Sequence, residues 1–292
     1  MQYLKYLAVL FVSINAFGCC ETKAVANLTG NEAIIKLDTI IKTDIEVEAE
    51  VIKNEVVTEI PAAETKTEIE NEILTDFKTV DHSLWNDLLQ KHVSDQGNVN
   101  YKGFNADHAK FNSYLELLTK NPPQESWSKD ETLAYWMNVY NAYTVKLILD
   151  NYPTKSIKDI NGPWNQRFIK IDEKWYTLND VEHKIIRKMG EPRIHFALVC
   201  AAVSCPRLYN KAFTANHLET DLDVLTRGFL NDTTKNELSE DHIKISKIFK
   251  WYGGDFKTNG NNLIDFLNQY SEVKISPNAK KSYKDYNWNI NE

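Results

Sequence analysis

The side chains that can carry chemistry gather in one stretch of the chain, residues 182–207. It contains two histidines, two cysteines, a serine, two carboxylates and several arginines. Thiols can act as nucleophiles and imidazoles as general bases. These residue types make the stretch the first place to look for an active site. The members considered below are Glu182, His183, Arg193, His195, Cys200, Ser204 and Cys205.

A thiol hydrolase is the first chemistry that this stretch indicates. Cysteine attacks as the thiolate, and a neighbouring imidazole lowers the pKa of the thiol. Cys200 is the candidate nucleophile, with His195 or His183 as the base. If residues 193–201 form a strand, His195 and Cys200 point to opposite faces, because they are five positions apart. Their pairing then needs a bulge, or else His183 on the preceding helix serves as the base.

The cysteines have three other interpretations. Cys200 can be a small buried core residue. In an exported protein Cys200 and Cys205 can form a disulfide that closes a short loop. His183, His195 and the two cysteines could also form a Cys2His2 set, but their spacing matches no familiar zinc pattern. We therefore predict no metal and no other cofactor.

Two asparagines on an apolar helix are candidates for orienting a site. Asn138 and Asn141 lie about one helical turn apart among aromatic and aliphatic residues, and buried carboxamides must find hydrogen-bonding partners. They can orient a histidine, bind substrate, or hold a neighbouring loop.

The remaining candidates lie in or near the same stretch. Glu182 can finish the cap of its helix or pair with Arg193. Arg193 can alternatively bind an anionic group of a substrate. Ser204 and Cys205 complete the candidate substrate-binding or orienting set, and Asp255, after two glycines, can reach a cleft from a turn.

The elements that must position these residues are mixed in type. Ser128 and Glu131 form a capping box that opens a helix, which Tyr152-Pro153 ends. Asn179 is expected to cap the next helix, which Gly190 terminates. Apolar periodicity predicts helices over 82–92, 105–119, 214–231 and 262–270, a hairpin over 167–178, and strands over 193–201, 242–246 and 283–290. The order is irregular, which favours an α+β domain with helices on a small, mainly antiparallel sheet.

Three segments of this domain carry a resemblance to a known family. YWMNVYNAYTV (135–145), LNDVEHKIIR (178–187) and RIHFALVCAAVSCPRL (193–208) resemble the domain of unknown function 547, found in bacteria and plants. IFKWYGGDF (248–256) and YNWNI (286–290) are similar to its C-terminal segments. The resemblance implies one domain over 76–292 and brings no established activity.

Two positions within the resemblance differ from the family. Ala201 stands where the family usually has glycine. Some relatives look like Ser-Ser-Pro at 204–206, which makes Cys205 a weaker candidate nucleophile than Cys200. By analogy, Cys/His chemistry also allows a papain-like or transglutaminase-like fold.

The N-terminus is typical of an exported lipoprotein. Lys5 precedes an apolar stretch that is too short to span a bilayer and ends at Gly18-Cys19-Cys20. We expect a signal peptide over 1–19, lipidation of Cys19 or Cys20, and a place in the bacterial cell envelope, periplasmic or surface-facing. Residues 20–75 lack aromatic side chains and are acidic, which predicts a flexible tether. No stretch is long and apolar enough to predict a transmembrane helix.

Composition and missing motifs exclude several function classes. The chain has 292 residues and a net charge of -7, and the tether carries the acidic excess. The chain has no surplus of basic residues that would favour nucleic-acid binding. The motifs GxGxxG, GxxxxGK[ST], HExxH and GxSxG are also absent. Two hypotheses follow: a thiol hydrolase acting on a peptide, amide or other acyl substrate, or a noncatalytic binding or scaffolding domain at the membrane surface.

Overall fold

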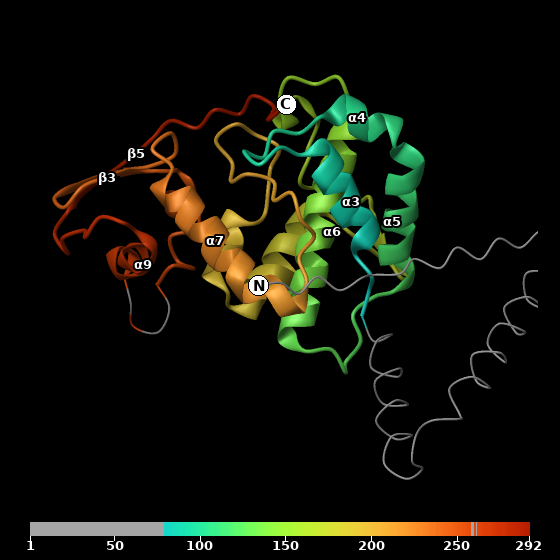
Figure 1. Ribbon diagram of the computed structural model, residues 1–292, viewed down its shortest axis with the longest axis horizontal. Coiled ribbons are helices and arrows are strands. Elements are labelled where there is room, and N and C mark those ends of the chain that lie inside the picture. Colours follow the sequence, from blue (N-terminus) through green and yellow to red (C-terminus); the bar gives the residue numbers. More distant parts are fainter. Residues whose placement is uncertain (1–78, 258–259, 261) are drawn as a thin grey trace, which may run out of the picture. The chain divides into compact units, whose positions relative to one another are not determined.

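The computed structural model describes residues 79–257, 260 and 262–292 (Figure 1). The expected signal peptide, Cys19, Cys20 and the whole of the expected tether lie outside these residues. No helix of the described part is long and apolar enough to cross a membrane. The helices and strands of the described part make up an α+β domain.

The first half of the domain is helical. Its core forms around α6 (Lys129–Asp150), whose central residues are buried on every side, including Tyr135, Met137, Tyr140 and Ile148. The predicted capping box is present, because Ser128 Oγ accepts from Glu131 N and the Glu131 carboxylate accepts from Ser128 N. Helices α4 and α5 both pack against α6. The helices of this half are α3 (Ser83–His92), α4 (Tyr101–Ala106), α5 (His108–Lys120) and α6 (Lys129–Asp150).

The middle of the chain consists of short elements. The predicted hairpin is confirmed, with β1 (Ile169–Ile171) antiparallel to β2 (Lys174–Tyr176). A π-helix, η2 (Asp180–Ile185), follows it. The Asn179 side chain does not cap η2. Instead Asp180 N donates to Thr177 Oγ1, and Thr177 N donates to the Asp180 carboxylate.

The strand predicted over 193–201 is wrong. A 3-10 turn, η3 (Ile186–Met189), ends at Gly190, as predicted, and the chain then forms the 3-10 helix η4 (Pro192–Phe196) and an irregular loop. Glu191 and Pro192 explain this start, because the Glu191 carboxylate accepts from Arg193 N and proline fixes the first helical residue. The apolar run is therefore a buried turn and not a strand.

The C-terminal half carries the second small sheet. Here β3 (Glu237–Leu238) pairs antiparallel with β4 (His242–Ile245), which pairs in parallel with β5 (Lys280–Tyr283). Strand β5 ends where the predicted last strand begins, and the later part of that stretch makes isolated bridges, Asn289 with Ser156 and Ile290 with Ala202. The remaining elements are η1 (Ile157–Asp159), η5 (Ala215–His217), α7 (Leu218–Asn231), α8 (Ile248–Trp251) and α9 (Leu263–Tyr270).

The buried side chains form two clusters that meet near residues 195–205. One cluster surrounds α6 and includes the loop after η4. The other gathers phenylalanines from η4, α7, α8 and α9 around Phe196. Tyr286, from the C-terminal segment, packs against both clusters. The chemistry-bearing stretch thus lies where the two clusters adjoin.

Candidate functional site

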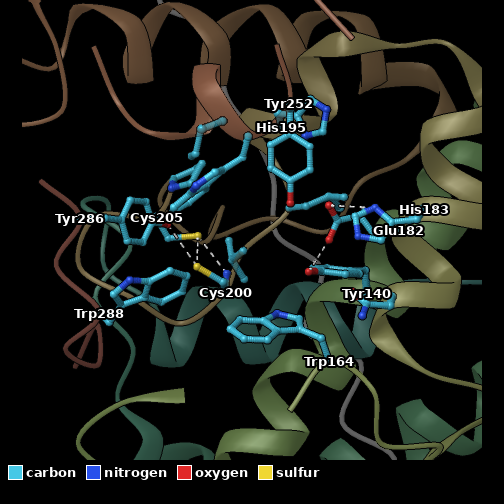
Figure 2. A pocket seen from close by; sticks show the side chains of 16 residues that line it. Tyr140, Trp164, Glu182, His183, His195, Cys200, Cys205, Tyr252, Tyr286 and Trp288 are labelled. Carbon is cyan, nitrogen blue, oxygen red and sulfur yellow. Dashed lines mark hydrogen bonds and ion pairs between the residues drawn. The ribbon is translucent and has the colours of Figure 1, made fainter. Parts of the chain in front are cut away.

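The three candidate catalytic residues line one cavity. This cavity has a volume of about 140 Å³, and its walls include Cys200, His195 and His183 together with Glu182 and Cys205. Figure 2 shows the cysteines with Tyr286 and Trp288 on one side of the view, and Glu182, His183 and Tyr140 on the other. The structure therefore gathers His183 from η2, His195 from η4 and Cys200 from the loop after η4.

The two sulfur atoms are in direct contact. Cys200 Sγ lies 2.9 Å from Cys205 Sγ and 3.3 Å from the Tyr286 hydroxyl, and Cys200 N donates to Cys205 Sγ at 2.9 Å. Both cysteines are free thiols. The structure thus holds two thiols at hydrogen-bonding distance.

The thiols of this pair differ in acidity. The hydrogen bond with Cys205 and burial raise the pKa of the Cys200 thiol. Burial alone would raise the pKa of Cys205 as well, but the donors from the Cys200 side chain and backbone outweigh it, so the pKa of Cys205 is lowered. The first thiolate to form is therefore on Cys205.

The loop that carries the sulfurs is fixed from two sides. Asn141 Nδ2 donates to Ala197 O at 2.9 Å and Asn141 Oδ1 accepts from Val199 N at 3.1 Å. On the other side, Val203 N donates to Asn289 O, and Asn287 N donates to Ser204 Oγ. The loop is thus held by α6 and by the C-terminal segment.

Ala201 adopts a backbone conformation that favours glycine. Its φ is 54°, in the left-handed region that side chains with a Cβ adopt at a cost. The turn between Cys200 and Ala202 therefore explains why glycine suits this position.

His195 is buried, and its imidazole is held by Asp255 and Tyr252. His195 Nε2 lies 2.8 Å from the Asp255 carboxylate, and its ring stacks on Tyr252 with centroids 4.0 Å apart. Burial lowers the pKa of His195, and Asp255 opposes this effect. Arg187 binds Asp255 through two hydrogen bonds of 2.7 and 2.8 Å, which lower the pKa of the carboxyl. Asp255 therefore fixes the orientation of the imidazole.

Glu182 places a buried carboxylate on the wall of the cavity. It accepts from the Tyr140 hydroxyl at 2.9 Å, and His183 Nδ1 lies 3.7 Å away. Burial, followed by the Glu182 charge, raises the pKa values of Tyr140 and Tyr252. Both phenols therefore remain neutral donors at neutral pH.

The predicted pairing of Arg193 with Glu182 is wrong. Arg193 instead binds Glu191 and Glu219, with its Nη2 2.7 Å from a carboxylate oxygen of each. Glu182, on η2, meets Tyr140 of α6, whereas Arg193, on η4, meets Glu219 of α7. Arg193 does not line the cavity.

Both asparagine carboxamides are occupied by backbone groups. Asn138 exchanges hydrogen bonds with the N–H and C=O of Phe213, just as Asn141 does with Ala197 and Val199. Asn138, Asn141 and Ser204 are not among the residues that line the cavity. The structure gives the two asparagines the loop-holding role that the sequence left open beside substrate binding.

The aromatic walls of the cavity were not predicted from the sequence. Tyr286 and Trp288 have ring centroids 4.5 Å apart, and Trp251 lies 4.8 Å from Tyr286. Trp164, far away in sequence, completes this side. The sequence signals were the segments IFKWYGGDF and YNWNI, whose places beside the cysteines depend on tertiary structure.

Metal binding finds no support among the described residues. Across 79–257 and 262–292, no group of three or more histidine, cysteine or acidic side chains is arranged to hold a metal ion. The side chains that line the cavity include thiols, imidazoles, phenols and a carboxylate.

Comparisons with known proteins agree with the resemblance in part of the chain. No curated protein and no solved structure matches the chain. Residues 124–230, which contain α6, η2, η4 and both cysteines of the cavity, match the family model described as "Protein of unknown function, DUF547".

Proposed function

We propose that the domain is a thiol hydrolase acting on a peptide, amide or other acyl substrate. One observation carries the proposal: Cys200, His195 and His183, chosen by residue type from the sequence, line the same cavity. Papain-like and transglutaminase-like enzymes use the same pair of residue types, and such sites are recognised by geometry and not by position in the chain.

We assign the attacking sulfur to Cys205. The nucleophile must be a thiolate, and the hydrogen bonds from Cys200 favour the thiolate on Cys205. Cys200, the first candidate from the sequence, then acts as the donor that stabilises this charge. Both sulfurs line the cavity, so either can meet a substrate there.

In the proposed reaction the Cys205 thiolate adds to the acyl carbon. The carbon–leaving group bond breaks with transfer of a proton to the leaving group, and a thioester forms on Cys205. Water then attacks the thioester, releasing the acid and restoring the thiol. His195 or His183 supplies and removes the protons. Neither sulfur is hydrogen-bonded to an imidazole among the described residues, and such contacts often tighten only when substrate binds.

Trapping the acyl-enzyme tests this proposal. The full chain, with Cys19 and Cys20 replaced by serine, is mixed with p-nitrophenyl acetate. The acetyl group should be found by mass spectrometry on the peptide that contains Cys205, and Cys205→Ala should abolish it. Val203→Ala, an exposed substitution in the same loop, is the matched control. Acetyl groups on surface lysines alone would refute a nucleophilic role for the thiols.

The role of the histidines is tested by the second step, hydrolysis of the thioester on Cys205. His195→Gln or His183→Gln, whichever residue is the base, should slow turnover by about 100-fold or more. If neither variant turns over more slowly than the original chain, base catalysis by an imidazole is contradicted.

A noncatalytic binding domain is the second candidate. The observation that favours it is the absence, in the described part of the chain, of a hydrogen bond between either sulfur and an imidazole. On this hypothesis Cys200→Ala and Cys205→Ala leave binding of a partner intact, whereas turnover is never seen with any acyl substrate.

We also propose that a lipid on Cys19 or Cys20 anchors the domain to the membrane of a bacterial cell envelope. A small residue before the cysteine pair, at the end of an apolar stretch, supports this. Expressed in a bacterium, the chain should partition into detergent and lose this behaviour in Cys19→Ser or Cys20→Ser. Unchanged partitioning in the double variant would refute the anchor.

A further inference from the structure

We propose that Cys200 and Cys205 form a thiol–disulfide exchange centre. In this activity the pair reduces a disulfide-bonded substrate and becomes an intramolecular disulfide. The proposal goes beyond acyl hydrolysis, because it needs neither an acyl substrate nor either histidine. It rests on two free thiols whose sulfur atoms are 2.9 Å apart.

The loop between the cysteines is organised for this reaction. Cys205 N donates to Ala202 O, closing a tight turn, and Ser204 N donates to Asn287 O. Asn141 holds the chain just before Cys200 through Val199 N. Two thiols held together in this way have a high effective concentration towards each other, so a mixed disulfide on one is rapidly attacked by the other.

The two cysteines have unequal access to a substrate. Cys205 lines the cavity that it shares with Cys200, and it also lines a larger groove of about 760 Å³ on which Cys200 does not border. Arg207, Lys235 and the exposed Val224 also line this groove. Cys205 is the more buried thiol and Cys200 is partly exposed, so the order of attack, Cys205 first and Cys200 second, rests on the hydrogen bonds that Cys205 accepts from Cys200.

The charge distribution supports the same order of attack. Cys205 accepts two hydrogen bonds from Cys200, and the positive charge of Lys235 lies close enough to favour its thiolate. Cys200 donates its S–H to Cys205, and this hydrogen bond together with burial raises the pKa of Cys200. The Cys205 thiol is thus activated for the first attack, and the Cys200 thiol makes the second.

The exchange balances in two steps. The Cys205 thiolate attacks one sulfur of the substrate R–S–S–R, forming Cys205–S–S–R and releasing R–S⁻, which takes up a proton. Cys200 loses its proton and attacks Cys205 Sγ, which forms the internal disulfide and releases the second R–S⁻. Two protein thiols are oxidised and one substrate disulfide is reduced to two thiols.

The test uses 5,5′-dithiobis(2-nitrobenzoate), itself a disulfide. The full chain carries Cys19→Ser and Cys20→Ser, so that only the proposed pair can react. The reduced chain should release two thionitrobenzoate ions per molecule, and its intact mass should show a disulfide with no retained adduct. Cys200→Ser should release one ion and keep the adduct on Cys205.

The opposite pattern would overturn the proposal. Retention of an adduct by the chain with both thiols, or release of no thionitrobenzoate from the folded protein, contradicts an exchange centre. Cys200→Ser nearly keeps the size of the side chain, and circular dichroism is used to check that this variant is folded. Because no acyl substrate is present, success or failure here is independent of the acetyl-trapping result.

Discussion

At the scale of single residues, the hydrogen bonds between the two cysteines make their thiols differ in acidity. Cys200 gives its backbone N–H and its S–H to Cys205, so one sulfur is acidified and the other is not. Residue types alone indicated thiol chemistry, and they also indicated Asp255 as a residue able to reach a cleft. The order of acidity could not be predicted, because it depends on which sulfur accepts.

The Asp255 carboxylate controls the titration of His195, which provides a first prediction. Removing the negative charge in Asp255→Asn should lower the pKa of His195 further, because Asp255 opposes the effect of burial. Histidine NMR, following the imidazole signals with pH, measures this shift. An unchanged midpoint for His195 would contradict the contact of 2.8 Å.

The same variant should change stability with a defined sign. The pKa of Asp255 is lowered in the folded protein, so its contribution is present above the unfolded pKa and is lost as the pH falls through the folded value. Asp255→Asn should therefore cost about 2 kcal/mol at neutral pH, and the difference from the original chain should shrink in acid. Asp223→Asn, in an exposed pair on α7, is the control and should have little effect.

At the scale of elements, the loop after η4 is the feature that sequence patterns described least well. The apolar run 193–201 has the length and composition of a strand, but Glu191 and Pro192 start a 3-10 helix there. The argument that His195 and Cys200 lie on opposite faces failed with the strand. By contrast, α6 and the β1–β2 hairpin were predicted, because a capping box and a turn are local signals.

Asn141 tests how this loop is held. Its carboxamide, almost completely buried, satisfies Ala197 O and Val199 N. Asn141→Ala leaves both groups without their partner and should reduce the free energy of unfolding by about 3 kcal/mol. Urea denaturation measures the change.

The matched control is Asn121, an asparagine at the C-terminal end of α5. Asn121 is exposed and makes one local hydrogen bond to Leu117 O, so Asn121→Ala should cost no more than about 0.5 kcal/mol. Equal losses in the two variants would show that Asn141 does not hold the loop.

At the scale of the whole domain, the C-terminal segment joins parts that are far apart in sequence. Asn291 accepts from the Tyr101 hydroxyl and its N–H donates to Ala201 O, while Asn289 O accepts from Val203 N. Tyr286 and Trp288 also form a wall of the cavity. No local pattern could place this segment, because its partners are up to 194 positions away.

Removing residues 284–292 is the prediction at this scale. The truncated chain should have a lower melting temperature, and both thiols should react faster with maleimide, because the loop that carries them loses its backbone partners. Deletion of Glu292 alone, which is exposed, is the control. Unchanged thiol reactivity after the longer truncation would contradict a role for the segment in shielding the pair.

The central claim is that the folded domain contains an activated thiolate on Cys205. Its most direct test is the rate of iodoacetamide alkylation as a function of pH, with the modified cysteine located by mass spectrometry. We expect Cys205 to react first, with a midpoint below the pKa of an ordinary thiol, and Cys200→Ala to raise that midpoint by removing a donor. Labelling of Cys200 first, or of neither cysteine until the protein unfolds, would contradict the claim.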